Sequence, residues 1–290
     1  MSFENRKPPG PRPPALHATR RGYGPRIVLV HGFTQTSASW ARISEQLEGD
    51  FEVVTPDLPG HGRSPLPDPG SGLAATARAL GEAGGKAGYV GYSLGGRCCL
   101  HLALESPGLV ERLVIVGAHP GIVDETERRQ RRAEDERRAA ELERGGDAVV
   151  AEFVEAWLSG PLFAHLTADQ ADRTSRLSNT AAGLAASLRT VGTGTQAPVW
   201  ERLGELEMPV LVVAGARDDK FRALAERTAD AIGRNARLAL VAGAGHAVFL
   251  ERPGAFVEIV REFLDPNACP SVSEADQSAI PRANRAPNAS

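Results

Sequence analysis

Residues 87–100 read AGYVGYSLGGRCCL, an apolar run that leads into the pattern G-x-S-x-G and then into a helical pattern. A serine in the sharp turn between a buried strand and a helix exposes its hydroxyl at the edge of the sheet, where it can react. Gly91 and Gly95 leave room for the crowded backbone of such a turn because they lack a Cβ atom. We therefore predict that Ser93 is the reactive group of a catalytic triad.

Short apolar runs before and after this turn predict a parallel sheet. They cover residues 26–31, 51–57, 87–93, 112–118, 209–215 and 236–243. Their Val, Ile and Leu residues occupy consecutive positions, which is typical of strands buried on both faces. Helical patterns lie between or after them, at residues 37–49, 71–83, 94–106, 219–233 and 254–264. The expected fold class is therefore α/β, a mostly parallel sheet flanked by helices.

Residues 122–204 interrupt this alternation, because they contain helical patterns and no strand-like run. We expect them to form a helical cap over the carboxyl ends of the strands, where such folds bind ligands. The core is then formed by residues 15–121 and 205–264. The first cap helix is rich in Glu and Arg, and we expect most of these charges to pair at i,i+4 on a solvated face. The proline-rich, polar tails 1–14 and 265–290 are expected to be disordered.

Composition excludes several classes of protein. With a net charge of -3 and 5% aromatic residues, the chain does not fit a nucleic-acid binder. It contains no run of about 18 apolar residues and no secretory signal, so we expect no membrane span. Its cysteines, Cys98, Cys99 and Cys269, are odd in number and favour a reducing cytoplasm. No metal-ligand cluster or dinucleotide fingerprint is present in the sequence, so we expect no cofactor.

A serine hydroxyl needs a base, and the base needs a carboxylate that fixes its tautomer. His246 follows the last apolar run and stands in the usual chain order of serine, acid and histidine. The acid is expected in GARDDKF after the run 209–215, where we favour Asp218 and keep Asp219 as the alternative. Asp57 is a weaker candidate because DLPGHGRS is typical of a structural turn.

Two backbone N–H groups are expected to form an oxyanion hole. One belongs to Phe33, in the turn after the run 26–31, and the other to Leu94, directly after the serine. His31 and His61 also follow strands, but each adjoins glycine and is interpreted as shaping a turn.

Arg97 lies one helical turn after Ser93 and can therefore share its face of the helix. A cation near a helix N-terminus is unfavourable for the helix dipole, so another interaction must offset it. An anionic ligand beside Ser93 would do this, since guanidinium groups bind carboxylates through paired hydrogen bonds. A structural salt bridge to a nearby acid is the alternative.

Over residues 15–264 the sequence resembles the α/β-hydrolase superfamily. Within it, LVHGF, DLPGHGRS, GYSLGGR, AHPGI, EAWLSGPLF, RLSNTAAGLAASLRTVGTGTQAPVW and GARDDKF resemble the 2-succinyl-6-hydroxy-2,4-cyclohexadiene-1-carboxylate (SHCHC) synthase family, known as MenH. The cap motifs matter most, because caps diverge quickly among these enzymes. The resemblance implies a lyase of menaquinone biosynthesis that eliminates pyruvate from a small polycarboxylate, with Ser93 acting as a base and forming no acyl-enzyme.

The resemblance also implies a set of residues that bind the substrate. They are Arg97, Arg131, Arg176, Trp157, Phe163 and Tyr92. Two positions depart from the family pattern: Leu158 stands where some members have tyrosine, and Phe249 where a second histidine is common.

Two other functions fit parts of this sequence. A serine hydrolase that cleaves an ester or a carbon–carbon bond would use the same triad. A ligand-binding receptor would use the fold as a pocket, but a complete triad and several arginines argue against it.

Overall fold

The computed structural model describes residues 15–265 and contains a seven-stranded sheet in the order β1-β3-β2-β4-β5-β6-β7. The strands β2 (Arg26–Val30), β3 (Glu52–Pro56), β4 (Ala87–Tyr92), β5 (Val110–Val116), β6 (Val210–Gly215) and β7 (Ala236–Val241) are parallel. Because Tyr92 pairs with Val116, and Val116 with Val213, the carboxyl ends of the three central strands meet at one edge of the sheet.

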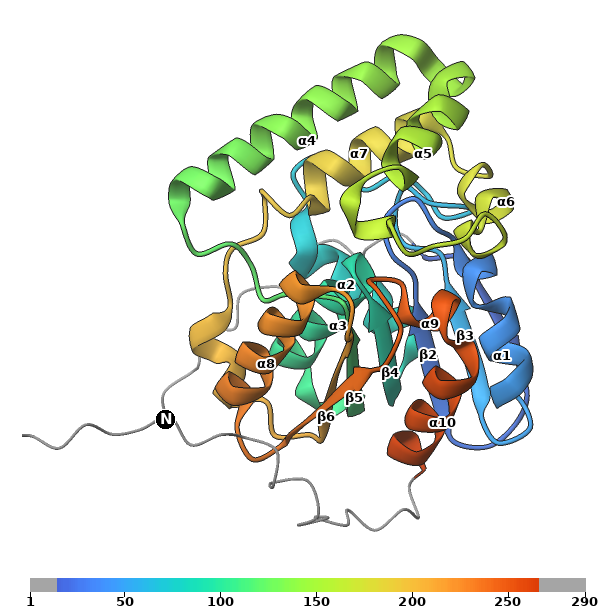
Figure 1. The fold of residues 1–290 in the computed structure, drawn as a ribbon, viewed down its shortest axis with the longest axis vertical. Helices are drawn as coiled ribbons and strands as arrows, with labels where there is room; N and C mark the ends of the chain where they lie inside the picture. The colour runs from blue at the N-terminus through green and yellow to red at the C-terminus, as the bar shows by residue number, and fades with distance from the viewer. Residues whose placement is uncertain (1–14, 266–290) are drawn as a thin grey trace, which may run out of the picture.

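Helices cover both faces of the sheet (Figure 1). On one face, α2 (Gly72–Gly84), α3 (Leu94–Glu105) and α8 (Asp219–Ile232) bury apolar side chains against the strands. On the other face lie α1 (Ala41–Leu47), preceded by η1 (Ser37–Trp40), and α10 (Pro253–Leu264), with the short α9 (Val248–Glu251) before it. The predicted α/β-hydrolase fold class is confirmed.

Between β5 and β6 the described chain forms only helices and loops, which lie above the carboxyl ends of the strands (Figure 1). The helices are α4 (Glu125–Gly145), α5 (Val150–Leu158), α6 (Arg173–Arg176) and α7 (Ala181–Val191). The same segment contains the short 3-10 helices η3 (Gly146–Val149), η4 (Pro161–Phe163) and η5 (Asp169–Ala171), and η6 (Trp200–Glu205) before β6. A further short helix, η2 (Pro107–Leu109), lies before β5. Helices α4, α5 and α7 bury a small apolar cluster of their own.

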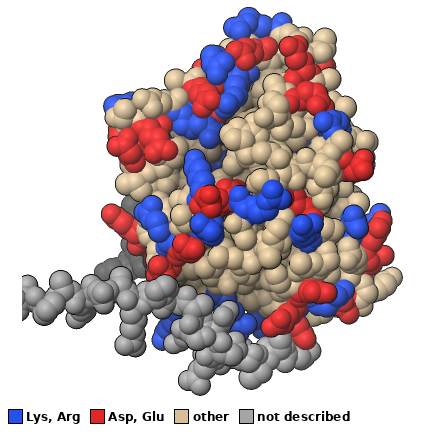
Figure 2. Space-filling view, viewed as in Figure 1, with Lys and Arg blue, Asp and Glu red and all other residues tan. Residues whose placement is uncertain are grey.

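Acidic and basic side chains are interleaved over α4 at the upper edge of Figure 2. Helix α4 contains the expected i,i+4 pairs Arg131–Asp135, Arg137–Glu141 and Glu134–Arg138. Arg189 of α7 forms ion pairs with Glu136 and Glu143 of α4. Some of the charged residues of α4 therefore also link it to α7.

The two edge strands differ from the expectation. The strand β1 (Ala18–Arg21), antiparallel to β3, was not predicted, because its exposed Arg20 and Arg21 break any apolar run. The last strand was expected to be buried on both faces, but β7 lies at the other edge and leaves Leu238 and Leu240 40% and 41% exposed. Tails 1–14 and 266–290, with Cys269, lie outside the described residues. Among residues 15–265, no helix is both long and apolar enough to cross a membrane.

Candidate active site

Ser93 occupies a strained turn between β4 and α3. Its φ of 50° is unusual for a residue with a side chain, and its N–H donates to the Val116 carbonyl at 2.8 Å. Neighbouring backbone leaves no space for larger residues in this turn: a Cβ atom on Gly91 would lie 2.5 Å from the Gly95 backbone, and one on Gly95 would lie 2.3 Å from the Val30 oxygen. The glycines expected around the serine are therefore required by close packing.

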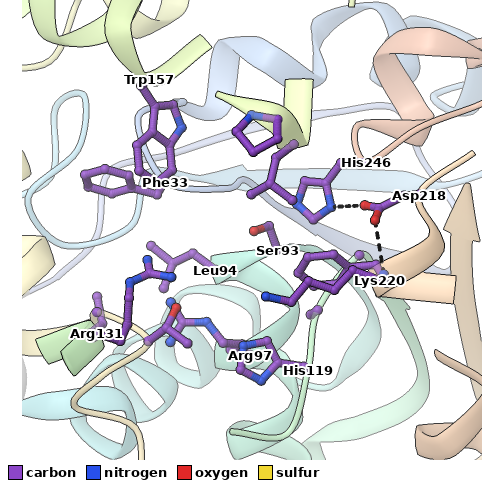
Figure 3. Close-up of a pocket in the computed structure, with 18 of the residues that line it drawn as sticks. Phe33, Ser93, Leu94, Arg97, His119, Arg131, Trp157, Asp218, Lys220 and His246 are labelled. Carbon is purple, nitrogen blue, oxygen red and sulfur yellow. Dashed lines mark hydrogen bonds and ion pairs between the residues drawn. The ribbon is translucent and has the colours of Figure 1, made fainter. Parts of the chain in front are cut away.

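His246 and Asp218 are joined by a hydrogen bond of 3.0 Å between Nδ1 and Oδ2. The second oxygen of Asp218 accepts from the Phe221 N–H at 3.1 Å, because Asp218 also caps the N-terminus of α8. Burial alone would raise the pKa of Asp218, but the His246 and Phe221 hydrogen bonds outweigh it and lower the pKa. Figure 3 shows Ser93 and His246 side by side, with Asp218 on the far side of the imidazole.

Asp219, the alternative acid, is placed differently. Its side chain is 87% exposed and pairs with Arg222 at 3.1 Å. Of the two neighbouring carboxylates, the structure brings Asp218 to the histidine.

The backbone on either side of His246 is fixed by a buried carboxylate. Glu251 accepts hydrogen bonds from the Gly245 N–H at 2.6 Å and from the Ala247 N–H at 3.0 Å. The backbone of Gly117 also lies close to His246, since a Cβ atom on Gly117 would be 3.1 Å from His246 Cε1. Glu251 thus fixes the backbone of His246, and Gly117 leaves room for its ring.

The N–H groups of Phe33 and Leu94 donate to no other residue of the described chain. Both residues line the same pocket as Ser93 and His246. The preceding N–H, that of Gly32, donates to Gln35 Oε1 at 3.0 Å and is therefore already engaged. Phe33 and Leu94 thus have N–H groups without an acceptor in the described chain, and an oxyanion hole formed by them stays a prediction.

The pocket encloses about 410 Å³ beneath the helices that follow β5. A cavity of this size suits one small molecule. Trp157 and Phe33 line it, with their rings 5.1 Å apart and nearly perpendicular. Among residues 15–265, no group of three or more His, Cys, Asp or Glu side chains could hold a metal ion.

Arg97 and Arg131 both reach this pocket (Figure 3). Arg97 is only 7% exposed and donates to Gln196 Oε1 at 3.2 Å, and no acidic side chain of the described residues pairs with it. Burial lowers the pKa of Arg97 to about 10, which leaves the group charged at neutral pH. Arg131 bonds the buried Asp135 at 2.9 Å. The salt-bridge alternative for Arg97 is not supported, and a buried cation without a carboxylate faces the pocket.

Arg176, Tyr92 and Phe163 do not line the pocket. Arg176 is fully buried, lies over the Phe163 ring at 5.5 Å and hydrogen-bonds the Ala171 carbonyl and the Thr34 hydroxyl. Tyr92 packs against His246 with ring centres 5.4 Å apart. Each of the three contacts a residue of the pocket, Tyr92 and Phe163 through His246 and Arg176 through the Phe33 carbonyl. For these three residues direct contact with the substrate stays a prediction.

Two pocket residues, Lys220 and His119, were missed by the sequence analysis. Lys220 lies two positions after Asp218 in GARDDKF, and His119 lies in AHPGI, shortly after β5. Both residues follow strands at the edge of the sheet where such folds bind ligands. Their position directly after a strand could therefore have identified them as pocket residues.

The remaining candidates have structural roles. Asp57 accepts from the Ser37 and Arg63 N–H groups at 2.7 and 2.9 Å, as expected for a turn. His31 Nε2 accepts from the Leu58 N–H at 2.9 Å, and His61 bonds a carbonyl within its own turn.

The two positions that depart from the family pattern are apolar contacts. Phe249 stacks on Trp40 at 4.1 Å, and Leu158 packs against the apolar cluster of the cap.

A sheet of this topology with a serine elbow and a histidine–aspartate pair defines a class of enzyme. The alpha/beta hydrolase family model matches residues 27–259, and the chain belongs to that family. It is 34% identical over 250 residues to a Bacillus subtilis protein named putative 2-succinyl-6-hydroxy-2,4-cyclohexadiene-1-carboxylate synthase, covering 82% of this chain and 89% of that one. It is also 34% identical over 258 residues to the synthase of that name from Salmonella agona, covering 86% and 98%.

Solved structures of other proteins match the same fold. MenH from S. aureus matches with a TM-score of 0.78 and 28% identity, over 86% of this chain and 97% of that one. An esterase from Thermogutta terrifontis matches with a TM-score of 0.72 over 86% and 92%, and at 23% identity it supports the fold alone.

Proposed function

We propose that this chain is an SHCHC synthase, a lyase that eliminates pyruvate from 2-succinyl-5-enolpyruvyl-6-hydroxy-3-cyclohexene-1-carboxylate. One observation supports this above the others: Ser93, beside the His246–Asp218 pair, lines a pocket that also contains the buried Arg97 and the paired Arg131. Cations beside a reactive serine suit a substrate with several carboxylates, since a neutral ester would not offset the desolvation of Arg97. The relatives named SHCHC synthase support the same reaction.

The chemistry follows from the positions of the double bonds. A 3-ene becomes a 2,4-diene when C2 loses its proton, the electron pair forms C2=C3, the old double bond shifts to C4=C5, and the C5–O bond breaks. Ser93 Oγ takes the C2 proton while its own proton passes to His246 Nε2. The leaving enolpyruvate accepts a proton and becomes pyruvate, so that protons and electrons balance. No acyl-enzyme forms.

The geometry suits the charge that develops. C2 bears the succinyl ketone, whose oxygen becomes negative as the proton leaves. The free N–H groups of Phe33 and Leu94 can donate to that oxygen beside Ser93. Arg97, one turn along α3, can pair with the carboxylate on the neighbouring ring carbon. These contacts strengthen in the transition state and therefore lower the barrier.

A serine hydrolase is the second candidate, favoured by the same free N–H groups. An oxyanion hole beside a nucleophilic serine would equally stabilise a tetrahedral intermediate of ester cleavage. Arg97 and Arg131 favour the lyase, because ester hydrolysis has no need for them.

The test offers the purified enzyme the elimination substrate and p-nitrophenyl acetate. Pyruvate release is followed with lactate dehydrogenase, and diene formation by absorbance. We expect pyruvate and diene in equal amounts, much slower ester cleavage, and loss of both products in Ser93→Ala. Comparable efficiency on the ester, or an acyl-serine detected by mass spectrometry on the productive path, would establish the hydrolase instead.

The proposal extends to the binding partner and the cellular compartment. The binding partner is the small polycarboxylate substrate. The buried free thiols of Cys98 and Cys99 suit a reducing compartment such as the cytoplasm.

A further inference from the structure

A second cavity, of about 950 Å³, adjoins the Ser93 pocket. The two cavities share four lining residues: His119, Arg131, Thr193 and Lys220. The second cavity extends outward from this junction between α4 and α8, where Gln130 and Arg227 line it. The junction therefore lies on the boundary between the reaction site and an outer chamber.

Lys220 provides a cation at the junction that has no partner in the described chain. Among residues 15–265 its ammonium group makes neither an ion pair nor a hydrogen bond. Figure 3 shows its side chain extending from the Asp218 side into the pocket, with Ser93 above it and His119 below. The acids that line the Ser93 pocket are already engaged, Asp218 by His246 and Asp219 by Arg222. Lys220 is thus available to an anion inside the pocket.

His119 adds a neutral donor beside this cation. Its Nδ1 accepts from the Gly121 N–H at 3.0 Å, so the proton of the neutral imidazole must be on Nε2. Burial, followed by the charges of Arg97, Lys220 and Arg131, lowers the pKa of His119 to about 3. No residue of the described chain accepts from Nε2, so an acceptor must come from a ligand or from water.

The substrate's own geometry indicates which anion reaches this place. On a six-membered ring C5 lies opposite C2, so a substrate with C2 at Ser93 directs its C5 substituent away from the serine. That substituent is the enolpyruvyl group, which carries a carboxylate and must leave after the C–O bond breaks. The outer chamber begins where this group would lie.

We propose that Lys220, His119 and Arg131 form a binding site for the carboxylate of the leaving enolpyruvyl group, at the junction of the two cavities. This inference rests on the proposed function. Lys220 and Arg131 supply the charge, and His119 Nε2–H supplies a directed hydrogen bond. Arg97 remains with the ring carboxylate beside the reacting carbon, so the two carboxylates have separate cations.

Pyruvate itself is the probe, and methyl pyruvate, which lacks the charge, is the matched control ligand. Binding to the full-length enzyme is measured from the pyruvate methyl signal in ligand-observed NMR, without any turnover. We expect pyruvate to bind and methyl pyruvate not to bind. Lys220→Met should raise the pyruvate Kd at least about fivefold, as expected for loss of a charge-assisted contact. Lys220→Arg should restore most of the affinity.

Two further variants separate this role from a structural one. Lys86→Met removes the other described lysine, 67% exposed and paired with Glu111, and should leave the pyruvate Kd unchanged. His119→Asn keeps an acceptor for the Gly121 N–H but removes the Nε2 donor, and should weaken pyruvate binding while thermal unfolding stays near that of the wild type. In turnover followed by diene absorbance, Lys220→Met should raise KM more than it lowers kcat.

The outcomes distinguish the two proposals. The junction site is overturned if wild-type enzyme shows no binding of pyruvate up to about 100 mM. It is also overturned if the pyruvate Kd stays within about twofold in both Lys220→Met and His119→Asn. Failure to release pyruvate from the elimination substrate overturns the proposed function, and the binding measurement does not depend on it.

Discussion

The Asp218→Asn substitution tests the proposed triad because the structure fixes how the new amide must lie. In the wild type, Oδ1 accepts from the Phe221 N–H and Oδ2 accepts from His246 Nδ1. Asparagine has one oxygen, and the Phe221 N–H requires it. The amide NH₂ then faces His246 Nδ1, which must become an acceptor, so the imidazole proton moves to Nε2 on the Ser93 side. In that tautomer His246 cannot take the proton of Ser93.

The alternative amide orientation restores the tautomer but places two donors against each other at Phe221. An unsatisfied buried donor costs about 1–3 kcal/mol, so this orientation is a minor population. It also lacks the negative charge that stabilises the imidazolium. Together these effects predict a loss in turnover of about 1000-fold to 10,000-fold, equal to about 4–5.5 kcal/mol of barrier. The assay is pyruvate release at saturating substrate, with the fold checked by circular dichroism.

Asp219→Asn is the matched control, since it removes an exposed carboxylate one position away. Its turnover should stay within about twofold of the wild type. Retention of more than about a tenth of wild-type turnover in Asp218→Asn would refute the tautomer argument. Loss of activity in Asp219→Asn alone would assign the acid to the neighbouring position.

Arg97→Met should lower kcat/KM by about 10- to 150-fold, with Arg97→Lys recovering only part of it because lysine lacks the planar fork; steady-state kinetics on the elimination substrate decide this. Glu251→Gln removes one of the two acceptors beside His246 and should lower kcat about tenfold with little change in KM, whereas an unchanged kcat would show that the carboxylate is dispensable. Gly117→Ala combines a φ of +54° with a Cβ atom 3.1 Å from His246 and should reduce both turnover and the urea midpoint. His61, whose pKa burial lowers to about 3, binds its proton near pH 6.5 when unfolded, so its contribution to stability is complete above pH 6.5 and declines as pH falls toward 3. Urea melts should show a shallower pH slope in His61→Asn, by up to about 1.4 kcal/mol per pH unit.

The central strands and the residues at their ends could be predicted from the sequence because local signals determine them. Ser93 stands in a motif whose glycines are required within the same turn, and His246 follows a strand in a fixed chain order. The sequence favours Asp218 and keeps Asp219 as the alternative, since both follow β6 and only the direction of each side chain separates them. Asp218 turns inward because it also caps α8.

The edge strands and the cap contacts could not be predicted in the same way. Strand β1 owes its structure to pairing with β3, and its own residues give no apolar pattern. The position of Arg176 depends on how α6 folds back onto the core, which spacing along the chain does not encode. Lys220 and His119 lie at strand ends, but a single lysine or histidine after a strand carries no spacing pattern that marks it as a ligand-binding residue.

The contact between α6 and the turn after β2 has a consequence for protein engineering. Arg176 bonds the Thr34 hydroxyl, and Asn179 Nδ2 donates to the Thr34 carbonyl at 2.6 Å, directly beside Phe33. Thr34 itself has a φ of 68°, a conformation that needs such external support. The segment between β5 and β6 is therefore not an exchangeable module: a chimaera that imports a foreign segment here loses the brace on a turn that presents one of the two free N–H groups. Chimaeras that exchange this segment between family members should keep their fold when Arg176 and Asn179 are exchanged together with the Phe33–Thr34 turn.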